Sequence, residues 1–113
     1  MAAPTYGIHG TPYDSVANTY NSPHNVAATR MGYFEIEAVN RNATSVTVRI
    51  AVGSDSTNPP ADEEHNEYDA VVQGNTPLIR TKIVGPSEYV WVRASATGVG
   101  FIVSGVEQDI PTA

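Results

Sequence analysis

Hydrophobic and polar residues alternate along much of the chain after residue 30, with the period of two that is typical of β-strands. The alternation is cleanest in residues 45–52 (SVTVRIAV), where every second residue is Val or Ile. It also holds in residues 34–38 (FEIEA). The pattern predicts two half-buried strands joined by a polar turn at residues 40–44. If they form a hairpin, Arg49 lies on the same outer face as Glu35 and Glu37.

The last third of the chain contains two runs of β-branched and aromatic residues, 88–95 (EYVWVRAS) and 99–107 (VGFIVSGVE). A turn containing Thr97 and Gly98 separates them, and this arrangement predicts a β-hairpin. Both faces of the hairpin carry apolar residues. Because a two-stranded hairpin is only marginally stable alone, we expect it to be covered inside a sandwich or by a neighbouring subunit.

Two further strands are expected at residues 67–73 and 76–84, on either side of a turn at Gly74 and Asn75. No segment has a helical period. Short strands with turns every eight to twelve residues predict an all-β fold, a small antiparallel β-sandwich of jelly-roll or immunoglobulin-like type with about six strands. We place this domain at residues 30–108, followed by a short tail at 109–113.

Residues 1–29 differ in composition, because they are rich in Pro, Gly and small polar residues and contain few aliphatic ones. Tyr6, Tyr13 and Tyr20 recur every seven residues, but the intervening Gly and Pro exclude a coiled coil. One interpretation is a floppy terminus with tyrosines placed by chance. The other, which we favour, is an extended arm whose tyrosines dock on a partner, so that deleting residues 1–27 would leave a folded domain.

Length and composition narrow the function. The 113 residues fit one domain, and twelve acidic against six basic residues give a net charge of −6, which argues against nucleic-acid binding. The absence of cysteine excludes disulfides and thiolate metal sites. We find no secretory signal and no apolar stretch long enough to span a membrane, and we expect synthesis in the cytoplasm.

The segment from Asp55 to Asp69 contains half of the acidic residues and no basic residue. It is interpreted first as a solvated acidic loop. The alternatives are a weak cation site built from carboxylate oxygens and an electrostatic contact with a basic partner. Its spacing matches neither the helix–loop–helix calcium motif nor the zinc-hydrolase helix.

No arrangement of residues indicates catalysis. His9, His24 and His65 are scattered over the arm and the acidic loop, and no serine lies in a nucleophile motif. We therefore expect a protein that is not an enzyme, with no catalytic, cofactor-binding or metal-binding residue. A glycosidase would need two carboxylates that face each other across a cleft, whereas the acids of the loop are contiguous.

Aromatic and basic residues of the strands are the candidates for binding. Trp91, the only tryptophan, is expected to pack in the core with Tyr89 and Phe101, or alternatively to stack on a sugar or a partner. The strand residues Arg49, Arg80, Lys82 and Arg93 can form a basic stripe, because alternate positions share a face. Partner-contacting residues are therefore predicted to be Tyr6, Tyr13, Tyr20, Arg80, Lys82 and Trp91.

Several segments together resemble small β-sandwich virion proteins of tailed bacteriophages, especially those of marine cyanophages. They are residues 28–32 (ATRMG), 39–51 (VNRNATSVTVRIA), 64–69 (EHNEYD), 77–84 (PLIRTKIV), 89–96 (YVWVRASA) and 103–107 (VSGVE). The resemblance covers residues 28–107 and does not include the arm.

The resemblance implies a virion location and a structural role, first as a capsid decoration (cement) protein that binds and stabilises the head shell with its arm. Its partners would be the major capsid protein or other virion proteins, and it would form a homo-oligomer, with a trimer favoured. No nucleic-acid or membrane partner is expected. The alternatives are a neck, tail or fibre accessory and a receptor- or glycan-binding tip, in which Trp91 and a cation in the acidic loop hold the sugar.

Overall fold

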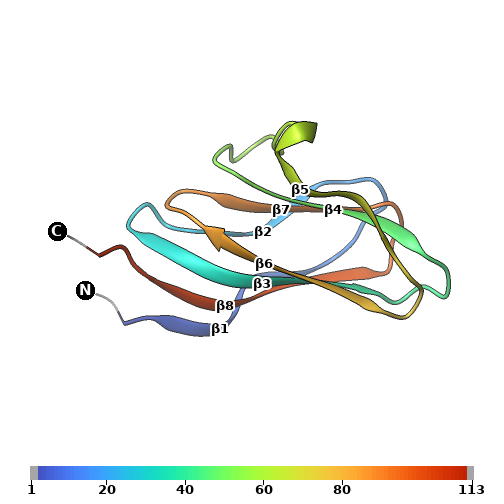
Figure 1. The fold of residues 1–113 in the computed structure, drawn as a ribbon, viewed down its shortest axis with the longest axis horizontal. Coiled ribbons are helices and arrows are strands. Elements are labelled where there is room, and N and C mark those ends of the chain that lie inside the picture. The colour runs from blue at the N-terminus through green and yellow to red at the C-terminus, as the bar shows by residue number, and fades with distance from the viewer. Residues whose placement is uncertain (1–2, 112–113) are drawn as a thin grey trace.

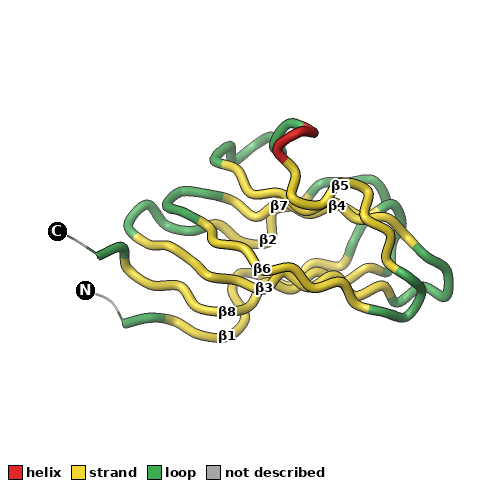
Figure 2. Tube along the Cα trace, viewed as in Figure 1, coloured by secondary structure: helices red, strands yellow, loops and turns green. Residues whose placement is uncertain are grey.

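The computed structural model describes residues 3–111, which form eight β-strands and one short 3-10 helix. The elements are β1 (Thr5–Asp14), β2 (Asn21–Asn25), β3 (Arg30–Asn40), β4 (Val46–Gly53), η1 (Asp62–Glu64), β5 (His65–Val72), β6 (Pro77–Val84), β7 (Tyr89–Ala94) and β8 (Val99–Asp109). Figure 2 shows that strands make up most of the chain. Among the described residues, no helix is long and apolar enough to cross a membrane.

The strands form two four-stranded sheets that pack face to face (Figure 1). Sheet A has the order β1-β8-β3-β6 and sheet B the order β2-β7-β4-β5, and every pairing is antiparallel. The predicted all-β sandwich is confirmed. It has eight strands where the sequence indicated about six, and their order is that of a jelly roll.

The expected hairpins do not form. β7 lies in sheet B and β8 in sheet A, so the turn at residues 95–98 carries the chain from one sheet to the other. β3 and β4 are separated in the same way, which places Glu35 and Arg49 on opposite sides of the sandwich. Turn residues mark a reversal of the chain, but they do not specify whether the next strand pairs with the previous one or crosses the core.

The N-terminal segment is not an arm, which corrects the predicted boundary at residue 29. β1 pairs with β8 from Thr5 opposite Glu107 to Asp14 opposite Gly100, and β2 pairs with β7. Both are edge strands with an irregular register, and edge strands with bulges are where a sheet tolerates Pro and Gly. Deleting residues 1–27 would therefore remove two strands of the sandwich.

The core lies between the sheets and consists mainly of valine. Phe34 and Phe101 of sheet A are its largest side chains, and neither is exposed to solvent. The remaining buried members are Val26, Ile36, Ala38, Val46, Val48, Ile50, Val72, Val84, Val90, Val92, Ala94, Val99 and Val103. Burial of each of these side chains stabilises the fold by about 25 cal/mol per Å² of apolar surface removed from water. The strands are therefore held together mainly by contacts between the two sheets.

Candidate functional site

The outer face of sheet A carries exposed apolar side chains from all four strands. One row runs straight across it, because Tyr6 of β1 lies opposite Val106 of β8, which lies opposite Tyr33 of β3, which lies opposite Ile83 of β6. Tyr6 is 78% exposed, Tyr33 57% and Ile83 63%. Ile8, Val39, Ile79 and Ile102 occupy neighbouring outward positions. We call these eight residues the apolar face.

Two carboxylates lie within the apolar face. Glu35 and Glu37 are the outward residues of β3 beyond Tyr33, and the buried Phe34, Ile36 and Ala38 alternate with them. Neither glutamate takes part in the ion pairs found in residues 3–111. Ser104 and Thr81 lie opposite Glu35 on the two neighbouring strands, so a polar row with a negative charge crosses the apolar face.

The three tyrosines of the N-terminal segment have different surroundings. Tyr6 belongs to the apolar face and is free to contact a partner. Tyr13 is half-buried against the core, with its ring stacked on Phe101 at a centroid distance of 6.3 Å. Tyr20 lies on the outer side of sheet B, where its hydroxyl is 2.9 Å from Nε2 of His65. Tyr13 and Tyr20 thus dock on their own chain.

The predicted basic and aromatic candidates are also separated. Arg80 forms an ion pair with Glu67, which ties β6 at the edge of sheet A to β5 at the edge of sheet B. Lys82 is half-buried on β6 and joins none of the ion pairs in residues 3–111. Trp91 is only 6% exposed, so it is not available for stacking on a sugar or a partner.

Trp91 is buried outside the main core. It alternates along β7 with the core residues Val90 and Val92, which places it on the outer side of sheet B, opposite Ala51 of β4. Phe101 belongs to sheet A and faces the core, so the expected packing of Trp91 against it is wrong. The connection between β4 and β5, which contains η1, rises on the outer side of sheet B (Figure 1).

An ion pair between Arg49 of β4 and Asp69 of β5 lies on the outer side of sheet B. The guanidinium of Arg49 donates two hydrogen bonds to the carboxylate of Asp69, at 2.7 and 3.2 Å, and a third to the Tyr20 hydroxyl at 3.2 Å. The hydrogen bonds from Arg49 lower the pKa of Asp69, and the bonds to Asp69 and Tyr20 raise the pKa of Arg49. The predicted basic stripe does not form, because Arg49 is committed to Asp69 and lies on a different sheet from Arg80.

The carboxylates of the acidic segment do not converge on a common point. Asp55 accepts hydrogen bonds from the backbone N–H groups of Thr57 and Asn58, and these bonds lower its pKa to about 2. Glu64 accepts a bond from the backbone N–H of Ala61, while Glu67 and Asp69 pair with arginines. This loop is therefore organised by contacts within the chain.

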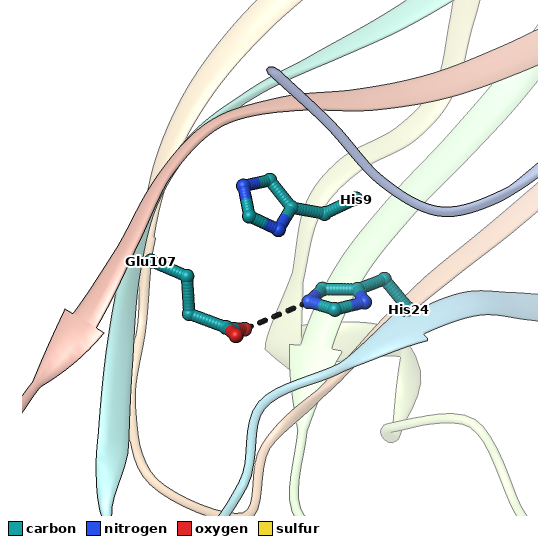
Figure 3. A group of neighbouring side chains, drawn as sticks. All are labelled: His9, His24 and Glu107. Atoms are coloured by element: carbon teal, nitrogen blue, oxygen red, sulfur yellow. Dashed lines mark hydrogen bonds and ion pairs between the residues drawn. The ribbon is translucent and has the colours of Figure 1, made fainter. Parts of the chain in front are cut away.

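A second candidate site lies between the two sheets at the end of the sandwich near the chain termini. His9 of β1, His24 of β2 and Glu107 of β8 point toward one another there (Figure 3). Nε2 of His24 is 2.9 Å from Oε1 of Glu107, and one nitrogen or oxygen atom from each residue lies within 4.8 Å of the other two. Among residues 3–111, these are the only three His, Cys, Asp or Glu side chains whose ligand atoms lie close enough together to hold one metal ion.

The His9–His24–Glu107 cluster is largely shielded from water. The side chains of His24 and Glu107 are 14% and 13% exposed, and His9 is 9% exposed. Both imidazole rings pack against the ring of Phe34, at centroid distances of 5.0 Å for His9 and 5.4 Å for His24. Nε2 of His9 is buried without a hydrogen-bond partner, whereas such atoms are normally satisfied.

Arg30 fixes the carboxylate of the cluster from the other side. Its Nε is 3.3 Å from Oε2 of Glu107, and it also donates a hydrogen bond of 2.8 Å to the Glu107 carbonyl oxygen. In addition, it forms an ion pair of 2.7 Å with Asp109. Oε1 of Glu107 is thereby turned toward His24, and the charge of Arg30 is shared between two carboxylates.

This cluster was not predicted from the sequence, although the pattern in β8 contains a signal for it. Val99, Phe101 and Val103 alternate on the buried side, and the same parity places Glu107 on that side. A carboxylate at a buried position requires polar partners. Those partners are Arg30 and His24, and both His24 and the neighbouring His9 lie in the segment that was interpreted as an arm.

Comparisons with known proteins identify no relative. No protein-family model matches the chain, and neither the curated proteins nor the solved structures give a significant match.

Proposed function

We propose that this protein is a structural component of a phage particle, a decoration protein that attaches to the head shell through the apolar face of sheet A. One observation carries the proposal: the apolar row of Tyr6, Val106, Tyr33 and Ile83 spans all four strands of one sheet, and all of its members except the half-buried Val106 are exposed. Monomeric soluble proteins rarely leave a contiguous apolar surface of this kind without a partner. The jelly-roll order of the strands, which recurs in viral capsid domains, and the resemblance in residues 28–107 support the same role.

The charge on the apolar face indicates whether the face binds a second copy of this chain or a different protein. A symmetric dimer through this face would bring Glu35 and Glu37 of one copy close to the same residues of the other. Like charges in a contact from which water is excluded are unfavourable. We therefore assign the face to a shell protein with apolar surface and a basic side chain that meets these carboxylates.

The two sides of the sandwich have different roles in this proposal. The apolar face contacts the shell, and the outer side of sheet B, which carries the ion pair between Arg49 and Asp69, remains in water. A rigid sandwich loses little conformational entropy when it docks, and many copies on a symmetric particle add avidity to each weak contact. Association of copies into a trimer would use surfaces other than the apolar face, because the shell covers that face in this proposal.

Matched variants test the surface. Ile83 and Val71 are exposed residues of the edge strands β6 and β5, at 63% and 62%, on different sheets. The assay is cosedimentation of the protein with phage shells that carry no copies of it. We expect Ile83→Asp to abolish cosedimentation and Val71→Asp to leave it unchanged. Equal loss in both variants, or none in Ile83→Asp, would reject the apolar face as the attachment surface.

Copy number in purified particles tests the location. A decoration protein is present in on the order of hundreds of copies, because it follows the symmetry of the shell, whereas a neck or tail accessory is present in roughly a dozen or fewer. A copy number of roughly a dozen or fewer would mean that the apolar face contacts a neck or tail protein instead of the head shell.

A further inference from the structure

We propose that His9, His24 and Glu107 form a binding site for a divalent cation, with Zn²⁺ as the preferred ion. The inference does not depend on the function proposed above, because it concerns the interior of the sandwich at its terminal end and not the apolar face.

The donor atoms select the class of metal. Two imidazole nitrogens and one carboxylate oxygen are a common ligand set for zinc, with the fourth position left for water or another ligand. Calcium and magnesium prefer sites made only of oxygen atoms. Imidazole donors favour zinc and its transition-metal neighbours, and zinc requires no redox partner.

The geometry is close to what zinc needs. Bonds of about 2.0–2.2 Å in a tetrahedron separate ligand atoms by about 3.3–3.5 Å. The donor atoms of the cluster already lie within 4.8 Å of one another, and His24 and Glu107 are 2.9 Å apart. Closure onto a metal therefore requires side-chain movements on the order of 1 Å, with the ion replacing the bond between His24 and Glu107.

The position of His9 beside the pair of His24 and Glu107 distinguishes a metal site from a simple ion pair. The interaction between His24 and Glu107 does not involve His9. The ring of His9 lies beside Phe34, and its Nε2 is buried without a hydrogen-bond partner. A cation between the three side chains would bring His9 into one site with this pair, through the ring nitrogen that lies within 4.8 Å of the donor atoms of His24 and Glu107.

Arg30 acts as the outer support of the site. Its Nε holds Oε2 of Glu107 and leaves Oε1 directed at the histidines, as outer-shell groups do for metal-bound carboxylates. Its positive charge would repel a cation if it were uncompensated, but Asp109 pairs with it at 2.7 Å.

Strand geometry makes this meeting of side chains specific. His9 and Glu107 come from the neighbouring strands β1 and β8 of sheet A, and His24 comes from β2 of sheet B. A bound ion would therefore join the two sheets and tie the N-terminal strands to the C-terminal strand. Zinc is expected to raise the thermal unfolding temperature, because it binds the folded chain and the site does not exist in the unfolded one.

Titration of the full-length, chelator-treated protein with ZnCl₂ tests the proposal. We expect saturable binding of one zinc per chain at micromolar concentration, and no saturable binding of CaCl₂ or MgCl₂. His9→Gln and His24→Gln should each weaken zinc binding by at least about 100-fold, since even outer-shell changes cost 10–100-fold. His65→Gln is the matched control, because His65 contacts Tyr20 on the outer side of sheet B, and it should bind zinc like the parent.

A measurement on the unaltered protein covers the case in which a variant does not fold. In its NMR spectra, zinc should shift the imidazole resonances of His9 and His24 and leave those of His65 unchanged. Absence of saturable binding, equal loss of affinity in His65→Gln, or a zinc-induced shift confined to His65 would overturn the assignment.

Discussion

Gly10 of β1 lies against the backbone carbonyl of Pro23 in β2, so close that a side chain at position 10 would collide with it. A Cβ atom there would also lie 2.9 Å from Cβ of His24. Gly10 has a φ of +68°, in the region that L-residues avoid. This close approach brings β1 and β2 together and sets His9 beside His24.

Replacement of Gly10 by alanine should therefore destabilise the sandwich strongly. Strain at positive φ costs about 1–2 kcal/mol, and overpacking against Pro23 adds about 1–3 kcal/mol. We expect the free energy of unfolding, measured by denaturant titration with circular dichroism, to fall by about 2–5 kcal/mol.

Gly7 is the control for Gly10. Its φ is +108°, but a Cβ atom at this position would meet nothing within 4 Å. Gly7→Ala should cost only the conformational strain, about 1–3 kcal/mol. If the two variants are equally stable, the contact between Gly10 and Pro23 does not hold β1 against β2.

Asn40, which is fully buried at the end of β3, is expected to be the most important polar residue of the fold. Its Nδ2 donates hydrogen bonds to the carbonyl oxygens of Thr44 and Val72, and its Oδ1 accepts one from the backbone N–H of Asn42. Asn40→Ala leaves these groups without partners, at about 1–3 kcal/mol for each that water cannot reach. We expect a loss of about 2–4 kcal/mol in the free energy of unfolding.

Asn42→Ala provides the comparison in the same turn. The Asn42 amide donates one hydrogen bond of 2.8 Å to the Thr97 carbonyl oxygen at an exposed position. Its removal should cost about 0.5–1.5 kcal/mol. A larger loss from Asn42→Ala than from Asn40→Ala would contradict the role given to the buried amide.

The sequence predicts the strands of this fold better than their pairing, for a physical reason. Alternation arises wherever one side of a strand is buried, so residues 34–38 and 45–52 are recognisable without knowledge of their neighbours. Whether the turn at residues 95–98 folds β8 beside β7 or across the core depends on all eight strands together. The hairpin prediction failed at this point, and because both faces of these strands carry apolar residues, only the structure shows that Val90, Val92, Phe101 and Val103 face the core.

The two candidate sites illustrate the same limit. Tyr6 was predicted as a contact residue, but its neighbours Tyr33 and Ile83 could be grouped with it only when the register of four strands was known. His9 and His24 were not predicted to meet, because the Gly and Pro residues of β1 and β2 prevented these segments from being recognised as strands. Such residues are tolerated in β1 and β2 because both are edge strands.

The ion pair between Arg49 and Asp69 should make stability depend on pH in the acid range. Arg49 lowers the pKa of Asp69 in the folded protein, so Asp69 binds a proton more readily when unfolded, with an ordinary pKa of about 3.9. Its contribution is complete above that pH and is lost as the pH falls through the folded-state pKa. The free energy of unfolding should thus fall below about pH 4, and less steeply in Asp69→Asn.

Glu63→Gln controls for the removal of a negative charge, because Glu63 of η1 joins none of the ion pairs in residues 3–111. Denaturant titrations between about pH 5 and pH 2 should show the parental slope in this variant. A weaker dependence of the free energy of unfolding on pH in Glu63→Gln, or an unchanged dependence in Asp69→Asn, would show that the ion pair is not the cause.

Trp91 gives a direct optical test of the two sides of the sandwich. As the only tryptophan, with 6% of its surface exposed on the outer side of sheet B, it should emit at short wavelength and resist quenching by acrylamide. If the protein attaches through the apolar face, Trp91 lies on the opposite sheet from the contact. Its emission should then be the same in the free protein and in the shell-bound protein.

A reporter on the apolar face completes this test. In a Trp91→Phe background, Tyr33→Trp places the single tryptophan at a position that is 57% exposed on the outer face of sheet A. This reporter should be quenched several times more strongly than Trp91 in the free protein, because acrylamide reaches it without crossing packed side chains. Binding to the shell should shift its emission to shorter wavelength and protect it. A change in the emission of Trp91 in the parent on binding, together with an unchanged reporter signal in the Tyr33→Trp variant, would place the contact on sheet B and refute attachment through the apolar face.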